Sequence, residues 1–230
     1  MKKGIQSIFS EVAETYELVN HVLTFGLDIL WRKKAAHIAS KAGGKLWMDV
    51  CSGTGEMAFN LSRQAGEKIN VISVDFCHPM FVKAKKKKKR ANIHFTLSEA
   101  SSLPFPDETF DLVTISFATR NINPNKDTLS NHLKEFYRVL KPEGRFVNLE
   151  TSQPSVKIIR KLFHFYIKLA VKHIGFLLSG SKAGYKYLSF TIPRFYSPGE
   201  FSSILHNAGY SRVACHPLFF GISAIHTAKK

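Results

Sequence analysis

The chain has 230 residues, of which 44% are apolar, and both values suit one domain with a sizeable buried core. It contains no run of about 18 uncharged apolar residues, and its first residues lack the apolar segment of a secretory signal, so we expect neither a transmembrane helix nor a leader. The formal net charge of +16 favours an anionic partner surface, either nucleic acid or anionic lipid, unless it reflects a lysine-rich proteome.

Residues 1–44 are expected to form two helices and a linker in front of the first strand. Apolar residues repeat at helical spacing over 5–16 and again over 27–38, and residues 24–26 interrupt the pattern. The segment 41–44, which ends in two glycines, closes this helical region.

An apolar run at 45–50 is followed at once by a glycine turn and another helical pattern. In a parallel α/β sheet, this order places the turn at the carboxyl end of a strand, where ligands bind. Gly53 and Gly55 lack a Cβ, so backbone N–H groups can approach a ligand closely there. The phosphate-binding fingerprint is GxGxxG, and this chain lacks its third glycine, which favours a nucleoside ligand without a pyrophosphate over a dinucleotide.

Acidic residues follow three successive predicted strands: Asp49, Asp75 and Glu99. Asp75 lies near the end of the strand predicted at 69–76 and 20 positions after Gly55, the spacing at which an acid accepts hydrogen bonds from ribose hydroxyls. The alternative for Asp75 is a cap on the next helix.

That next helix ends in a basic segment at 83–90, where seven of eight positions are Lys or Arg. Cations suit the negative end of the helix macrodipole, so a solvated helix end explains the segment without a partner. A patch that binds lipid or RNA is the alternative.

Strands and helices then alternate regularly. Strands are predicted at 93–97, 110–117 and 145–150, and an amphipathic helix at 126–140. This alternation indicates an α/β fold with a doubly wound, mostly parallel sheet.

Near the carboxyl end, residues 179–196 are predicted to form a loop. A capping box at Ser197 and Glu200 then starts a helix that reaches about residue 207. Two strands, at 213–219 and 222–228, flank a tight turn and predict a terminal antiparallel β-hairpin.

The segment 157–178 differs from the other predicted helices. Its polar residues form one narrow basic stripe, and the remaining positions are almost all apolar. Such a helix either packs over the domain or lies in a membrane interface, where lysine side chains extend to the headgroups. Both interpretations can hold for different parts of its surface.

Motifs spread along nearly the whole chain resemble those of the UbiE/MenG quinone C-methyltransferases. The N-terminal motifs are Phe9-x-x-Val12-Ala13-x-x-Tyr16, Asn20, Gly26 and Trp31-Arg32. The middle motifs are Leu103-Pro104-Phe105-Pro106-Asp107, Phe110-Asp111, Ile115-Ser116-Phe117, Arg120-Asn121, and Arg138-Val139-Leu140-Lys141-Pro142 with Gly144. The C-terminal motifs are Ser179-Gly180-Ser181, Tyr185-x-Tyr187-Leu188, Gly221 and Ala224-x-His226.

The resemblance implies a class I methyltransferase with a Rossmann-like fold and S-adenosylmethionine as methyl donor, without a metal. It divides a single domain into four segments. These are a helical cap at 1–44, a donor-binding α/β core at 45–153, a lid helix with a substrate loop at 154–196, and a last helix with the hairpin at 197–230.

By motif position, the resemblance also implies which residues hold the donor. The methionine part would meet Asp49 and the glycine turn, and the ribose would meet Asp75. Glu99 stands where the family usually has Asn or Asp, so the contact with the adenine amino group departs from the family pattern. The expected donor-site residues are Asp49, Cys51, Gly53, Thr54, Gly55, Asp75, Phe76, Glu99, Ala100 and Ser116.

The implied reaction methylates a ring carbon of a prenylated hydroquinone. Demethylmenaquinol is the preferred acceptor, and 2-methoxy-6-polyprenyl-benzoquinol of the ubiquinone route or another prenylated aromatic is the alternative. The ring carbon becomes nucleophilic when a phenol oxygen loses its proton, which requires a polar group beside that oxygen. The candidates are Arg120, Asn121, Tyr185, Tyr187 and His226, although a lone histidine in a terminal strand is often structural.

Two other functions are compatible with the charge. An RNA methyltransferase needs hydrogen-bond acceptors for a flipped base after the fourth strand, where this chain has Ser116-Phe117-Ala118-Thr119, so we do not expect a nucleic-acid partner. The second alternative is a basic binding module without catalysis. The intact acids and glycines of the donor site argue against it, because such a module would not need them.

The expected partners are therefore the prenylated quinol and an anionic membrane surface. The membrane contacts are assigned to residues 157–178 and to the lysine run at 83–90, and a homodimer is left open. Three cysteines without a CxxC spacing predict reduced, buried thiols: Cys51, Cys77 and Cys215. We expect a cytoplasmic protein that is peripheral at the inner face of the cell membrane.

Overall fold

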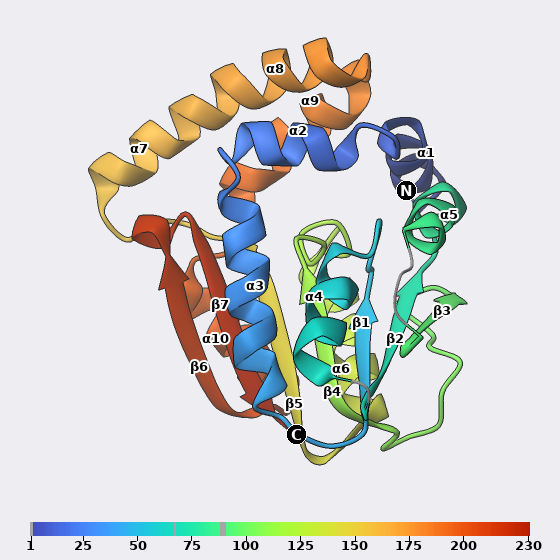
Figure 1. Ribbon diagram of the computed structural model, residues 1–230. Helices are drawn as coiled ribbons and strands as arrows, with labels where there is room; N and C mark the ends of the chain where they lie inside the picture. The colour runs from blue at the N-terminus through green and yellow to red at the C-terminus, as the bar shows by residue number, and fades with distance from the viewer. Residues whose placement is uncertain (1, 67, 88–90) are drawn as a thin grey trace.

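The computed structural model describes residues 2–66, 68–87 and 91–230, and these form a seven-stranded sheet in the order β3-β2-β1-β4-β5-β7-β6 (Figure 1). All neighbouring pairs are parallel except β5 with β7 and β6 with β7, which are antiparallel. The predicted doubly wound sheet and its terminal hairpin are thus confirmed. The strands are β1 (Leu46–Val50), β2 (Asn70–Asp75), β3 (Ile93–Leu97), β4 (Phe110–Ser116), β5 (Leu140–Thr151), β6 (Ser211–Leu218) and β7 (Ser223–Lys229).

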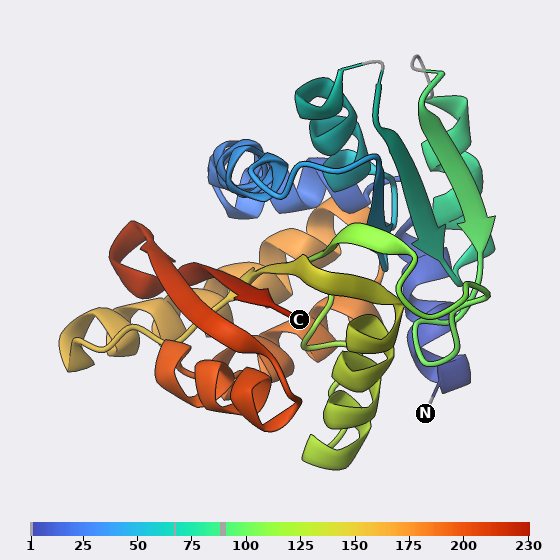
Figure 2. The ribbon, with the colours of Figure 1, turned by 90° about the horizontal axis from the view of Figure 1, so that it is seen from below.

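Helices cover both faces of this sheet (Figure 2). Around the buried residues Trp47 and Leu61, α3 (Leu27–Ser40) and α4 (Glu56–Ala65) pack on one face. On the other face, α6 (Lys126–Val139) and α10 (Pro198–Asn207) pack around Phe136 and Phe201. The remaining core helix is α5 (His78–Lys86), which follows β2.

A layer of helices, here called the cap, lies across one end of the sheet (Figure 1). The sheet ends there at Asp75 of β2 and Ser116 of β4, so the cap covers the carboxyl ends of parallel strands. Its own buried core includes Val19, Phe163 and Leu188. The cap elements are α1 (Lys2–Val12), α2 (Tyr16–Leu23), α7 (Lys157–Tyr166), the π-helical turn η1 (Ile167–Val171), α8 (Lys172–Ser179), α9 (Lys182–Thr191) and the 3₁₀ turn η2 (Ile192–Arg194).

The predicted single helix over 5–16 is wrong, because the chain breaks between α1 and α2. The backbone N–H of Thr15 turns back to the carbonyl of Val12 at 3.1 Å. The carbonyls of Ala13 and Glu14, which the break leaves without helical partners, accept hydrogen bonds from the Lys83 ammonium at 3.1 and 2.5 Å. A side chain from α5 therefore stabilises the break.

The predicted loop at 179–196 is also wrong, because most of it forms α9 and η2. Ser181 caps α9 by accepting a hydrogen bond from the backbone N–H of Gly184 at 3.2 Å. Tyr185, Leu188 and Ile192 follow at helical spacing and are buried in the cap core. Their burial against α8 and η1 stabilises a helix that local glycine and proline residues obscure in the sequence.

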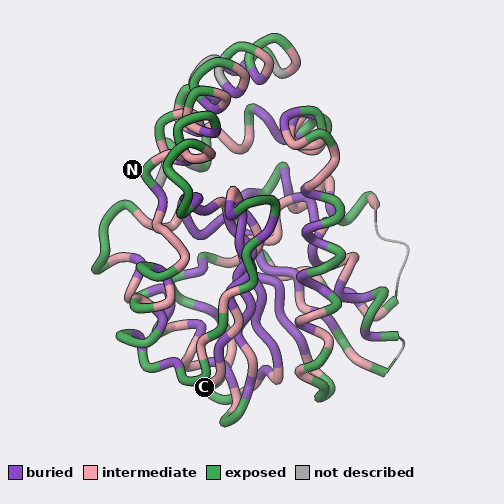
Figure 3. The backbone as a smooth tube through the Cα atoms, turned by 90° about the vertical axis from the view of Figure 1, so that its left-hand side faces the viewer, coloured by how far each residue is buried: buried purple, intermediate pink, exposed green. Residues whose placement is uncertain are grey.

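Burial follows the layers of the fold (Figure 3). The inner strands are largely buried, whereas the edge strands β3 and β6 are mostly exposed or half-buried. The cap helices alternate between buried and exposed positions. Of the described helices, none is both long and apolar enough to span a membrane. The cysteines are free thiols as predicted, but only Cys77 is fully buried, whereas Cys51 and Cys215 are half-buried.

Candidate active site

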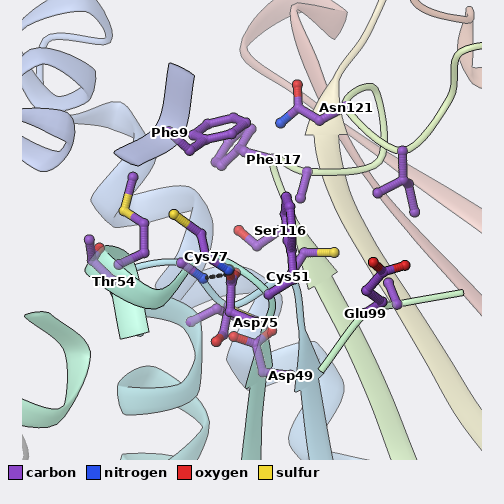
Figure 4. Close-up of a pocket in the computed structure, with 18 of the residues that line it drawn as sticks. Phe9, Asp49, Cys51, Thr54, Asp75, Cys77, Glu99, Ser116, Phe117 and Asn121 are labelled. Carbon is purple, nitrogen blue, oxygen red and sulfur yellow. Dashed lines mark hydrogen bonds between the residues drawn. The ribbon is translucent and has the colours of Figure 1, made fainter. Parts of the chain in front are cut away.

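A cavity, here called the strand-end cavity, lies where β1, β2 and β4 end beneath α1 and α2 (Figure 4). Asp49 and Asp75 lie at one end of it, and the rings of Phe9 and Phe117 lie at the other. Gly55 is the predicted donor-site residue that is not part of this wall. The predicted residues that line the cavity are Asp49, Cys51, Gly53, Thr54, Asp75, Phe76, Glu99, Ala100 and Ser116.

The glycine turn has the left-handed backbone that the sequence pattern suggests. Gly53 and Gly55 have φ angles of 56° and 83°, in the region that glycine adopts without steric cost. A Cβ on Gly55 would lie 3.0 Å from the Phe59 ring and 3.2 Å from the Cβ of Ala84. Gly55 is therefore small because Phe59 and Ala84 pack against it.

Asp75 holds the glycine turn against the start of the next helix. Its two carboxylate oxygens accept hydrogen bonds from the backbone N–H groups of Gly53 and Cys77, each at 2.7 Å. Burial raises the pKa of Asp75, and these N–H donors oppose that rise. A carboxylate offers further lone pairs, so the structural role leaves acceptor capacity for a ligand hydroxyl, and the predicted ribose contact stays a prediction.

Asp49 is the most unusual group of the strand-end cavity. One of its oxygens accepts a hydrogen bond from the Thr114 hydroxyl at 2.7 Å, and the other has no partner among the described residues. Burial raises the pKa of Asp49 to about 7. The Ser116 hydroxyl and the Asn121 amide oxygen are likewise buried without a described partner. Because buried polar atoms are normally hydrogen-bonded, this wall suits a ligand that carries an ammonium group and hydroxyls.

Cys51 does not have the character of a nucleophile, although it faces the same cavity. Burial raises the pKa of its thiol well above the usual value, and the charges of Asp75 and Asp49 raise it further. The reactive thiolate is therefore strongly disfavoured.

A second, larger cavity of about 410 Å³, here called the cap cavity, lies between α2, the start of α3, α7 and the 3₁₀ turn η3 (Phe219–Gly221). It shares Tyr16, Arg32 and Phe117 with the strand-end cavity, so the two cavities adjoin. Its other lining side chains are mainly aliphatic and aromatic. They include Leu23, Trp31, Ile159, Phe163, Ile167, Val171, Leu188 and Ile192.

Arg120 and Asn121 are adjacent in the chain, but Arg120 lines the cap cavity and Asn121 lines the strand-end cavity. The buried guanidinium of Arg120 donates to Glu150 at 2.5 Å, and the backbone N–H of Arg120 donates to the same carboxylate at 3.2 Å. Burial alone would lower the pKa of Arg120, but the charge of Glu150 raises it, and the net pKa lies above the usual value. The Nε–H of this permanent cation has no described partner.

The structure does not bring Tyr185 or His226 to either of these two cavities. Tyr185 is buried in the cap core, and His226 lies in β7 with its Nε2 3.1 Å from the carbonyl oxygen of Pro198 and its ring against Phe201. The two cavity walls therefore give no support to their predicted catalytic roles, which stay predictions. Tyr187 also lies outside the two cavity walls, but its hydroxyl is within the field of Arg120, which opposes the rise that burial causes in the pKa of Tyr187.

Tyr16, Arg32 and Phe117 form the shared wall, and sequence reasoning did not assign them to the site. Arg32 is buried, pairs with Asp28 at 2.5 Å and Glu56 at 3.2 Å, and lies 5.0 Å from the centre of the Phe117 ring. The sequence did carry one signal for Arg32, which is a charged residue on the apolar face of α3. A buried arginine requires acidic partners, so such a residue indicates a buried ion-pair network. His21 completes this ion-pair network beside Asp28 at 2.9 Å.

The profile of the ubiE/COQ5 methyltransferase family matches residues 1–230. The chain belongs to the ubiE/COQ5 methyltransferase family. Among curated relatives, the proteins named ubiquinone/menaquinone biosynthesis C-methyltransferase UbiE from Rickettsia bellii (strain OSU 85-389) and Rickettsia felis are 35% and 36% identical to it. These matches cover 98% and 100% of this chain and 92% and 94% of the relatives.

Solved structures confirm the fold of this ubiE/COQ5 family member. A SAM-dependent methyltransferase from Aquifex aeolicus superposes with a TM-score of 0.60 at 21% identity, covering 85% of this chain and 88% of the other. A putative methyltransferase from Haloferax volcanii, in complex with its Trm112 activator, superposes with a TM-score of 0.66 at 15% identity, covering 95% and 96%. The protein is therefore an S-adenosylmethionine-dependent methyltransferase, and the resemblance seen in its motifs is confirmed.

The basic segment at 83–90 contributes to the site from inside the fold. Lys83 holds the break between α1 and α2, and Lys87 forms an ion pair with Glu17 of α2. Since Phe9 of α1 and Tyr16 of α2 line the strand-end cavity, these lysines hold the cap over that cavity. Two described members of the run are thus engaged internally, and residues 88–90 lie outside the described residues.

Replacing Lys83 with methionine is expected to raise the KM for S-adenosylmethionine by about threefold to tenfold, since each lost hydrogen bond weakens the cap by about 1 kcal/mol. We expect kcat to change little. Initial-rate kinetics would measure both constants, with Lys86→Met as the matched control, because Lys86 is exposed at the end of the same helix. An unchanged KM in the Lys83 variant would show that the hydrogen bonds of Lys83 do not contribute to donor binding.

Proposed function

We propose that the enzyme methylates a ring carbon of a prenylated hydroquinone in quinone biosynthesis, with demethylmenaquinol as the preferred acceptor. The observation that carries this proposal is the apolar cap cavity, which adjoins the strand-end cavity and has a buried, permanently charged Arg120 in its wall. The names of the curated relatives point to the same chemistry.

The strand-end cavity would hold the donor. S-adenosylmethionine, when bound, supplies a methyl group that is attached to a positively charged sulfur. Once the methyl group is transferred, that sulfur leaves as part of a neutral thioether. Asp49 would pair with the ammonium of the methionine part, because its unpartnered oxygen lacks a donor in the free protein. Asp75 would accept from the ribose hydroxyls, and Glu99 with Ala100 would flank the adenine, as the motif positions imply.

The aromatic ring would lie at the shared wall of Tyr16 and Phe117, which places it between the two cavities. Arg120 would bind the phenol oxygen through its free Nε–H and stabilise the negative charge that makes the ring carbon nucleophilic. Over the full reaction, the ring exchanges one hydrogen for a methyl group and releases one proton. Glu150 keeps the guanidinium fixed, so it does not reorganise as the charge develops.

The cap cavity would take the prenyl tail. Its aliphatic and aromatic walls exclude water from the charged oxygen, which strengthens the interaction with Arg120. An RNA backbone would find few hydrogen-bond partners on such walls. The naphthoquinol is preferred over the methoxy-benzoquinol because its fused second ring is apolar, whereas a methoxy oxygen would need a polar partner.

Methyl transfer from labelled S-adenosylmethionine tests the proposal, with demethylmenaquinol, 2-methoxy-6-polyprenyl-benzoquinol and bulk RNA as parallel acceptors in detergent. We expect label in the naphthoquinol. Label only in the benzoquinol would retain the reaction class and change the ring. Label in RNA, with none in either quinol, would refute the proposal.

A further inference from the structure

The helix formed by α7, η1 and α8 is apolar on two sides, but the molecule covers only one of them. Phe163, Ile167 and Val171 point inward and are buried. On the other side, a row of large apolar side chains is exposed at helical spacing, and the helix runs across the outside of the cap (Figure 1). The exposed row is Ile158, Leu162, Phe165, Leu169 and Phe176.

Three further exposed aromatic residues lie at the wall of the cap cavity beside Leu162. Phe25 comes from the turn between α2 and α3, and Phe219 and Phe220 come from the turn between β6 and β7. Phe25 is 82% exposed and Phe220 is 71% exposed. The exposed row on α7 to α8 and these three residues are called the docking face below.

The backbone at these three aromatic residues is strained. Phe25, Phe219 and Phe220 have φ angles of 53°, 41° and 57°, in the left-handed region that bulky residues seldom adopt. These three side chains are exposed to water and their backbone is strained, so they contribute nothing to the stability of the fold. Such strain concentrates where a protein binds something.

The charge along the helix of the docking face has one sign. No Asp or Glu occurs between Glu150 and Glu200, whereas the same stretch contains eight Lys or Arg residues. Lys157, Lys161 and Lys168 are exposed along the helix that carries the apolar row. Apolar side chains flanked by cations alone suit an anionic lipid surface, with the apolar groups at the acyl boundary and the cations at the headgroups.

We propose that the docking face binds an anionic lipid bilayer and turns the mouth of the cap cavity toward the acyl chains. The cavity wall and the docking face share Phe25, Leu162, Phe219 and Phe220, so a ligand's apolar tail passes between bilayer and cavity without crossing water. That this tail belongs to a quinol rests on the proposed function, whereas the lipid contact does not.

A second copy of the chain fits the same face less well. A symmetric dimer would place this patch against itself. Cations without intervening acids would then face cations, and their repulsion would oppose the contact. A bilayer of anionic lipid instead supplies the opposite charge.

Co-sedimentation of the full chain with vesicles tests the proposal. We expect binding to phosphatidylcholine vesicles that contain about one third phosphatidylglycerol, weaker binding to pure phosphatidylcholine, and a decrease as salt rises, because screening shortens the reach of the cations. The double variant Phe165→Glu/Leu169→Glu should bind anionic vesicles about tenfold or more weakly. Neither residue lines the two cavities, and the matched control is Leu97→Glu, an exposed apolar position on β3.

Donor binding and thermal unfolding equal to the wild type would show that the double variant is folded. The proposal fails if the wild-type protein stays in solution with anionic vesicles at physiological salt, or if the double variant binds as tightly as the wild type. It also fails if light scattering finds a dimer that the double variant converts to a monomer, because the face then belongs to a second copy. Co-sedimentation needs no methyl acceptor, so a failed quinol assay would not change the conclusion about lipid binding. A failed sedimentation test would likewise not change the conclusion about the quinol.

Discussion

Arg120→Lys is expected to lower kcat by about 100-fold or more while leaving the affinity for S-adenosylmethionine within about threefold. Lysine keeps the charge, but its one nitrogen cannot occupy both the position of Nη1, which donates to Glu150, and the position of the unpartnered Nε. The charge that develops on the acceptor oxygen would then lack its fixed partner. Steady-state kinetics with a quinol acceptor, together with calorimetric titration of the donor, would separate the two effects.

The matched control for this prediction is Arg194→Lys, because Arg194 is exposed in the cap and stacks on Phe190 without lining either cavity. We expect no change in that variant. Glu150→Gln should lower kcat by about tenfold, since the guanidinium keeps its neighbour but loses the charge that orients it. A kcat for Arg120→Lys that matches the control would remove Arg120 from the mechanism.

Asp49→Asn is expected to weaken binding of S-adenosylmethionine by about 10- to 100-fold at pH 8 and to stabilise the ligand-free protein at the same pH. Both effects have one cause, because Asp49 is a fully buried carboxylate with one unpartnered oxygen. Ionisation makes it an ion-pair partner for an ammonium, and without the ligand that charge is costly to bury. Asparagine keeps the acceptor for Thr114 and removes the charge.

The direction of the pH dependence follows from the raised pKa. The pKa of Asp49 is about 7 in the folded protein, and an unfolded aspartate titrates near pH 4. The neutral form is favoured in the folded state, so this contribution to stability is present below about pH 4 and is lost as the pH rises through about 7. Between pH 5 and pH 8 the wild type should lose on the order of 2 kcal/mol that Asp49→Asn does not lose.

Donor affinity should change with pH in the opposite sense. An ammonium binds the ionised carboxylate, so the affinity of the wild type should be full above about pH 7 and fall toward tenfold per pH unit below it. Denaturant unfolding and donor titration at pH 5, 6, 7 and 8, on the wild type and on Asp49→Asn, would measure both trends. Parallel curves for the two proteins would show that Asp49 does not titrate in this range.

The walls of the two cavities were predictable from the sequence to very different degrees. The predicted donor-site residues, apart from Gly55, line one cavity, because their motifs follow strands β1, β2, β3 and β4 directly. Parallel strands bring their carboxyl ends to one edge, so local signals were sufficient there. The acceptor side was predicted only in part. Arg120 lines the cap cavity, but Tyr185 and His226 pack elsewhere.

The amino-acid sequence by itself determined the α/β class, the succession of strands and helices in the core, the glycine turn and the acids at the ends of three strands, because each depends on spacing within one strand–turn–helix unit. Tertiary structure decided the break after Val12, the helix α9, the shared wall of Tyr16, Arg32 and Phe117, and the exposed aromatic residues beside the cap cavity. These features join segments that lie far apart in the sequence. Their stability comes from burial and ion pairs between elements, which no local periodicity records.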